Sequence, residues 1–200
     1  TLEDATTTFV PALEKAINRV AEPGLVNLEA FLAALPSSIS SDPTLRTKLA
    51  PAVLAPTKSV SAPTRAAAVR VFSTLFSAGD EAELLPVAEQ VYTPIRTGKT
   101  TSPDHRTTLY TLLAALPASA RLSPEVVSTA LTALAKETNE ATFAALMRAL
   151  GAHLPAALVA DAGVPQPQTA ALTKSLGDTK PALRRLAQAA LGGVFWTLEK

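Results

Sequence analysis

The 200-residue sequence contains no cysteine, a single methionine and a single tryptophan. Without cysteine, the chain has neither a disulfide framework nor a thiolate metal site. Aromatic residues make up only 4% of the chain, which suits close packing between helices better than a fold built of sheets. No run of about eighteen apolar residues occurs, so the sequence predicts no membrane-spanning helix.

The residues that dominate are alanine and leucine, both strong helix formers. Hydrophobic residues make up 48% of the chain and charged residues 18%, which allows a packed core and argues against global disorder. The sequence has neither an initiator methionine nor a signal peptide, and it ends inside its last predicted helix. We therefore expect residues 1–200 to be one segment of a longer cytoplasmic protein.

The stretch 178–200 has the clearest helical pattern, with apolar residues that follow one face at helical spacing. Four apolar positions with offsets of 0, 3, 4 and 7 recur along the chain, with one serine among them. The five sets are Leu183, Leu186, Ala187 and Ala190; Phe143, Leu146, Met147 and Leu150; Leu109, Leu112, Leu113 and Leu116; Val69, Phe72, Ser73 and Phe76; Leu28, Phe31, Leu32 and Leu35. Their first members, at 28, 69, 109, 143 and 183, are separated by 41, 40, 34 and 40 residues.

A period near 40 with two helices in each unit is typical of HEAT repeats. The sequence thus predicts an all-α fold, an α-solenoid of about five HEAT-type helix pairs. We expect these pairs to occupy approximately residues 1–36, 42–78, 80–117, 123–151 and 165–200. The first helix of three pairs also carries a proline between apolar residues, at Pro11, Pro51 and Pro86, which favours the same architecture.

Two local interpretations concern the ends of helices. Glu22-Pro23-Gly24 predicts a turn, with the return helix running over 25–35. Gly151 predicts the end of the helix that begins at Glu140, followed by an irregular piece over 153–167 with one helical turn at 155–160.

The motifs that carry chemistry are mostly absent. Gly98-Lys99-Thr100 resembles the end of a phosphate-binding loop, but Thr93 stands where that loop needs glycine, so an inter-helix loop is the better interpretation. His105 and His153 lie in different repeats and have neither cysteine nor an HExxH spacing near them. We therefore expect no enzyme, no cofactor, no metal site and no small-molecule substrate.

Charge is distributed unevenly although the net charge is only +1. Residues 43–79 contain five basic residues and no acidic one, whereas residues 80–90 contain four acidic residues and no basic one. Because the turns of a solenoid align along the same ridges, the basic residues Lys58, Arg65, Lys99 and Arg106 are candidates for one stripe that contacts RNA phosphates. The alternative is that these residues are ordinary solvated charges.

Seven segments of the chain carry a resemblance to a known family: Val10 to Arg19, Glu22-Pro23, Leu28 to Leu35, Leu49-Ala50-Pro51, Lys58-Ser59, Ala66 to Leu75 and Thr179 to Trp196. They resemble the N-terminal region of the general-control translational activator family. The family comprises very large eukaryotic HEAT-repeat proteins that bind ribosomes and activate the amino-acid-starvation kinase of initiation factor two.

The resemblance implies a non-enzymatic scaffold in the cytoplasm that contributes to ribosome binding. In that family the kinase is contacted far C-terminal of this region, so we expect the kinase to be engaged through other regions of the full protein. The alternative function is that of a general HEAT-repeat adaptor for protein partners, of the phosphatase-scaffold, transport or cytoskeletal type.

Overall fold

The structure, a computed structural model, describes residues 1–98, 102–120, 124–160, 170, 173–178 and 180–198. Over these residues the chain forms helices and connecting turns, with no β-strand among them, so the all-α prediction is confirmed there. No helix within the described ranges is long and apolar enough to span a bilayer.

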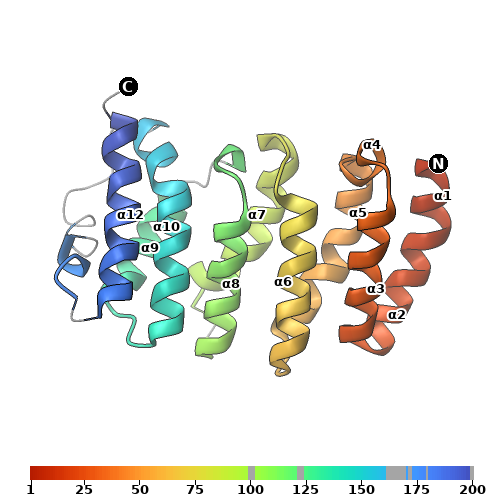
Figure 1. Cartoon of the computed structure of the whole chain (residues 1–200), viewed down its shortest axis with the longest axis horizontal. Helices are drawn as coiled ribbons and strands as arrows, with labels where there is room; N and C mark the ends of the chain where they lie inside the picture. Colours follow the sequence, from red (N-terminus) through yellow and green to blue (C-terminus); the bar gives the residue numbers. More distant parts are fainter. Residues whose placement is uncertain (99–101, 121–123, 161–169, 171–172, 179, 199–200) are drawn as a thin grey trace.

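The helices form two layers, and successive helices of one layer lie side by side (Figure 1). One layer contains α1 (Leu2–Asp4), a π-helical turn (Ala5–Phe9) that continues into α2 (Val10–Arg19), α5 (Pro43–Leu54), a 3-10 turn η2 (Ala55–Lys58), α7 (Glu81–Arg96), a 3-10 turn η3 (Ala118–Ala120) and α9 (Pro124–Leu134). The other contains α3 (Ala21–Ala34), α6 (Ala62–Phe76), α8 (Pro103–Ala115), α10 (Glu140–Ala160) and α12 (Pro181–Leu198). The short helix α4 (Ser37–Ser40) connects α3 to α5.

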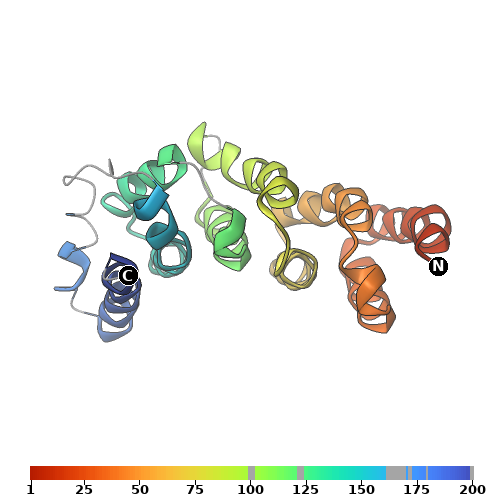
Figure 2. The same cartoon turned by 90° about the horizontal axis from the view of Figure 1, so that it is seen from above.

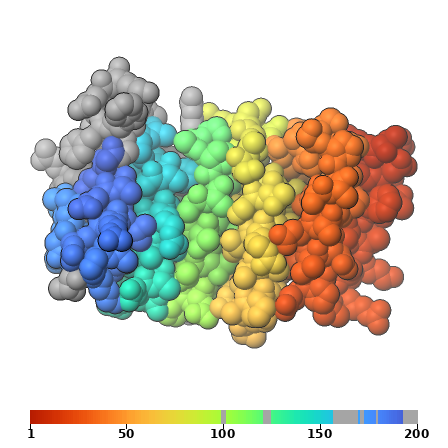
Figure 3. Space-filling model, viewed as in Figure 1, coloured from red at the N-terminus to blue at the C-terminus, as the bar shows by residue number. Residues whose placement is uncertain are grey.

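The array is elongated and gently curved (Figure 2). The layer of α3, α6, α8, α10 and α12 lies on the inner side of the curve, and the layer of α2, α5, α7 and α9 on the outer side. On the inner face the helices stand next to each other in sequence order, from the N-terminal to the C-terminal end (Figure 3). This open stack, in which each part packs on its neighbours in sequence, is consistent with an α-solenoid.

Helix starts follow the capping residues in the sequence. The Asp42 side chain accepts a hydrogen bond from the backbone N–H of Thr44 at 2.8 Å, and the Asp80 side chain accepts one from Glu83 N–H at 3.0 Å. Such bonds satisfy N–H groups that have no partner within their helix. Proline directly follows the cap in α5 and α8, because its fixed φ angle suits the first helical turn.

The apolar positions of the recurring pattern form the core between the layers. Their second members Phe72, Leu112 and Leu146 are each 0% exposed in the middle of the array. At the two ends, Phe31 and Leu186 occupy the same position and are only partly buried against the core. A position is therefore fully covered only where helices pack on both sides of it.

The interpretation of Glu22-Pro23-Gly24 as a turn is wrong, because α3 already begins at Ala21. The break in the chain is at Val20, whose extended backbone (φ −143°, ψ 97°) joins α2 to α3. Pro23 is tolerated in the first turn of α3, where its missing N–H costs no helical hydrogen bond. Gly24 allows the two helices to approach closely, since a Cβ atom there would lie 2.6 Å from the Ile17 backbone.

The prediction that a helix ends near Gly151 is also wrong, because α10 continues to Ala160 with Pro155 inside it. Gly151 lies where α12 packs on α10, and a Cβ atom at Gly151 would meet Ala190 at 3.5 Å. The extra turns of α10 replace the first part of the irregular piece expected over 153–167. The rest of that piece, like much of the first helix expected for the pair 165–200, falls outside the described residues.

Candidate functional site

The four basic residues predicted to contact RNA differ in their exposure and in their ion pairs. Lys58 ends η2, is exposed, and has no acidic partner within the described part of the chain. Arg65 and Arg106 both take part in ion pairs. Lys99 lies outside the described residues. The stripe therefore stays a prediction, and Lys58 is its most accessible member among the described residues.

Arg65 holds the start of α8 and the loop before α6 together. Its guanidinium donates to the backbone oxygens of Ser59 at 2.8 Å and Val60 at 2.9 Å. It also pairs with the Asp104 carboxylate at 2.8 Å, and the Arg65 side chain is only 12% exposed. An RNA phosphate would have to share this arginine with Asp104.

Arg106 forms one of the two best-enclosed ion pairs described, with Glu137 in the turn before α10. The Arg106 Nε and Nη2 atoms donate to the two carboxylate oxygens of Glu137 at 3.0 and 3.2 Å. The same carboxylate accepts from the backbone N–H groups of Thr138 and Asn139. Burial alone would raise the pKa of Glu137, but these hydrogen bonds and the charge of Arg106 outweigh it and lower that pKa.

Similar pairs connect other neighbouring units along the array. The remaining described pairs of this kind are Arg70–Glu29, Arg46–Glu83, Arg96–Glu125 and Lys180–Glu140. Their partners are 29 to 41 residues apart in the sequence, close to the repeat period. The uneven charge along the sequence thus partly reflects an acid in one unit that pairs with a base in the next.

The inter-unit contacts also include two buried polar groups. His153, which is 3% exposed, forms a 2.7 Å hydrogen bond through Nε2 with the backbone oxygen of Leu113, near the C-terminal end of α8. Burial lowers the pKa of His153, so the ring is neutral and donates this bond. Thr142, which is fully buried, bonds through its hydroxyl to Thr107 at 2.9 Å. His105 and His153 lie in different units of the array. Among the described residues, no group of three or more acidic residues and histidines is placed to hold a metal ion.

Lys58 and Arg65 lie at the same end of the helix stack, next to His105. Burial, followed by the charges of Lys58 and Arg65, lowers the pKa of His105. Since Arg65 is paired with Asp104, Lys58 supplies the unpaired charge at this end. Arg106 instead faces the turn before α10 through its pair with Glu137.

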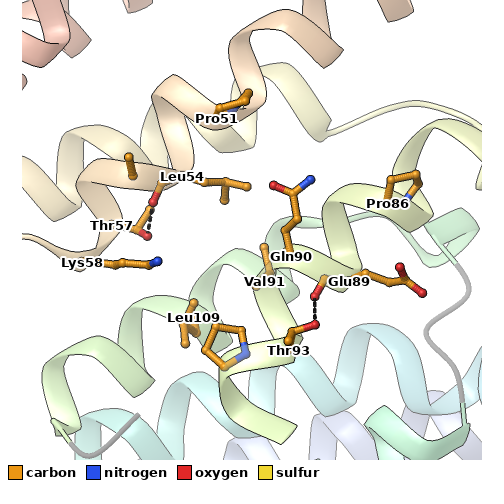
Figure 4. A pocket seen from close by; sticks show the side chains of 12 residues that line it. Pro51, Leu54, Thr57, Lys58, Pro86, Glu89, Gln90, Val91, Thr93 and Leu109 are labelled. Carbon is orange, nitrogen blue, oxygen red and sulfur yellow. Dashed lines mark hydrogen bonds between the residues drawn. The ribbon is translucent and has the colours of Figure 1, made fainter. Parts of the chain in front are cut away.

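A groove of about 670 Å³ lies beside Lys58, between the α5–η2 segment and α7. Its walls include three prolines, Pro51, Pro86 and Pro94, and its apolar lining continues through Leu54, Ala55, Val91 and Leu109. Lys58 and Gln90 extend toward the space between the two walls, whereas Glu89 extends away from Lys58 (Figure 4). Pro51 and Pro86 were predicted only to reflect the repeat architecture, and the spacing of prolines on successive outer helices was the signal available for this groove.

Comparisons with known proteins identify part of the chain. Residues 103–200, from the first residue of α8 onward, match the family described as general control nonderepressible 1 (Gcn1), N-terminal. The match includes the segment Thr179 to Trp196 that carries the resemblance in the sequence, whereas the earlier segments precede it. No curated protein sequence matches the chain.

The fold also resembles a solved structure, the crystal structure of an engineered protein from a structural genomics consortium. The two superpose over 94% of this chain and 85% of that chain, with a TM-score of 0.51 and 16% sequence identity. At that identity the similarity concerns the fold alone. Residues 103–200 are thus similar to the N-terminal region of the Gcn1 family.

Proposed function

We propose that the chain is a non-enzymatic scaffold segment of a Gcn1-type translational activator that helps the full protein to bind ribosomes. The observation that carries this proposal is the family match over residues 103–200. In this proposal the helices are HEAT-type repeats, paired approximately as 1–36, 42–78, 80–117, 123–151 and 165–200. The protein acts in the cytoplasm, and activation of the starvation kinase takes place through other regions of the full protein.

Ribosome contact in this proposal depends on RNA phosphates and on basic residues at the turns. Lys58 is the best-placed candidate, since its ammonium group is exposed and has no acidic partner among the described residues. Phosphate contacts of this kind position a protein on RNA without reading its bases. Arg65, Lys99 and Arg106 are further candidates, with Arg65 and Arg106 sharing their charge with Asp104 and Glu137.

The test is co-sedimentation of the chain with ribosomes over a series of salt concentrations. We expect Lys58→Glu to weaken binding and to reduce the slope of log affinity against log salt by roughly one contact. Lys48→Glu is the matched control, because Lys48 is equally an exposed lysine without an acidic partner among the described residues, and lies on α5 of the same unit. Equal effects of the two variants, or binding that does not depend on salt, would contradict a phosphate contact at Lys58.

Arg65→Glu is a less specific probe. It removes the bonds to Ser59, Val60 and Asp104, so it perturbs the loop before α6 as well as any RNA contact. A loss of ribosome binding in that variant would count for the proposal only if its melting temperature were unchanged.

The second candidate function is a general adaptor that binds protein partners. It is favoured by the proline-lined groove, which offers an apolar surface next to a single cation rather than a row of cations. If the chain binds no ribosome at any salt concentration but binds peptides in the groove, the adaptor function replaces the first proposal.

A further inference from the structure

We infer that the groove between the α5–η2 segment and α7 is a docking site for a short peptide segment that carries a carboxylate next to apolar side chains. The inference goes beyond ribosome binding, since it proposes that an apolar groove binds a protein partner, whereas ribosome contact was assigned to exposed basic residues. It rests on the shape of the groove, its polar side chains and its charge.

The shape and lining of the groove suit a peptide. The volume of about 670 Å³ falls in the range usual for ligand sites, about 300–1,000 Å³. The lining is mainly apolar, and Leu54, Val91 and Leu109 contribute to it from three different helices. An apolar side chain that enters the groove is therefore removed from water on several sides, which is the main favourable term in association.

The α7 wall carries a side chain that can form hydrogen bonds. The Gln90 side-chain amide is exposed and extends toward the groove (Figure 4). A peptide backbone has the donors and acceptors that match this amide.

Charge selects an acidic peptide. The ammonium group of Lys58 stands at the η2 side of the groove without an acidic partner among the described residues, and Glu89 points away from it (Figure 4). Arg65, near the same end, is already paired with Asp104, so Lys58 is the cation that a bound carboxylate would meet. A carboxylate bound to Lys58 forms a charge-assisted hydrogen bond, which is stronger than a neutral one.

RNA fits this groove poorly. The lining contains one cation among three prolines and several aliphatic side chains, whereas RNA-binding grooves follow the phosphate backbone with many cations. The lining residues also include no aromatic side chain on which a base stacks. A single cation beside an apolar surface instead matches one acidic residue in an apolar peptide.

The experiment is selection of a phage-displayed library of random dodecapeptides on the whole chain, followed by affinity measurements with the selected synthetic peptides. Ala55→Trp fills the groove from an exposed lining position, and Lys58→Glu reverses its charge. The matched controls are Ala82→Trp on the first turn of α7, which lies outside the lining, and Lys48→Glu. Circular dichroism tests whether each variant keeps the helicity of the wild type.

We expect the selected peptides to share an aspartate or glutamate next to aliphatic or aromatic residues. Their affinity should fall roughly tenfold or more in Ala55→Trp and in Lys58→Glu, as expected for loss of a charge-assisted or well-buried contact, and stay within about twofold of wild type in both controls. If Ala55→Trp lowers helicity, Gln90→Trp fills the groove from the opposite wall and serves in its place.

The inference is overturned if no peptide is enriched, if the enriched peptides lack an acidic residue, or if their binding survives the groove-filling variant. The proposal for ribosomes is tested separately by the same variants. Filling the groove should leave ribosome co-sedimentation unchanged, because the ammonium group of Lys58 stays exposed, whereas Lys58→Glu should weaken both activities. Ribosome binding that is lost on filling the groove would overturn the assignment of this surface to a peptide.

Discussion

The ion pair of Arg106 with Glu137 should be worth more to stability than any other pair described. The Glu137 side chain is 7% exposed and accepts bonds from two guanidinium nitrogens and two backbone N–H groups. Removing the Glu137 carboxylate takes away the acceptor of the Arg106 guanidinium and of the Thr138 and Asn139 backbone N–H groups. These donors are then left in a largely enclosed environment. Breaking such an arrangement from one side costs about 2–4 kcal/mol.

Urea unfolding of Glu137→Ala at neutral pH measures this cost. For a chain of this size, with a slope of about 2–3 kcal/mol per molar urea, the midpoint should fall by roughly 1 M. Glu137→Gln is the isosteric control, which keeps an acceptor oxygen and loses the charge, so its effect should be intermediate. In a double-mutant cycle with Arg106→Ala, the two losses should fall short of additivity by about 1 kcal/mol or more.

The pH dependence gives an independent check on the same pair. Because the pKa of Glu137 is lowered on folding, its stabilising effect is complete above the unfolded value of 4.5 and is lost as the pH falls through the folded value. The difference between wild type and Glu137→Ala should therefore shrink below about pH 4.5. An undiminished difference at pH 3, or a loss of less than about 0.5 kcal/mol at pH 7, would refute the reasoning.

Three further predictions concern packing and burial. Leu146→Ala should cost about 2–5 kcal/mol in urea unfolding, and Leu186→Ala at the equivalent but partly exposed position clearly less. Gly24→Ala should lower the melting temperature, because its Cβ atom would lie 2.6 Å from the Ile17 backbone, whereas Gly192→Ala, with no neighbour within 4 Å, should not. Wild type should lose stability as the pH falls from 7 through 6.5, since the unfolded chain binds a proton that buried His153 does not, and His153→Gln should remove part of this loss in pH-dependent melting.

The sequence predicted the helices well where apolar periodicity and capping residues agreed. Asp42 and Asp80 cap the helices that follow them, and such a side-chain cap is a local feature that a sequence can carry. Gly24 and Gly151 were misinterpreted as helix ends for one shared reason. Each glycine lies inside a helix where another helix comes close, at Ile17 and at Ala190. Sequence alone does not distinguish a glycine needed for close approach from one that ends a helix.

The candidate site was harder to predict from the sequence than the helices were. Periodic spacing predicted that Arg65 and Arg106 lie near turns, but not that Asp104 and Glu137 lie against them from the next unit. The separation of 39 residues between Arg65 and Asp104 is near the repeat period, so a search for opposite charges one period apart would have found this pair. The groove depends on the distance between two outer helices, which no local pattern encodes.

The ion pairs between neighbouring units differ in solvent exposure, and this difference has a mechanical consequence. The Lys180–Glu140 pair between α12 and α10 and the Arg70–Glu29 pair between α6 and α3 have exposed members, whereas the Arg106–Glu137 pair between α8 and the start of α10 is largely enclosed. Dissolved ions screen exposed pairs far more than enclosed ones. The array should thus behave as a series of joints of unequal stiffness, softer where the pairs are exposed and firmer at Arg106–Glu137 and Arg46–Glu83. Its curvature should change first between the units that exposed pairs connect when ionic strength rises or a bound partner exerts force on it.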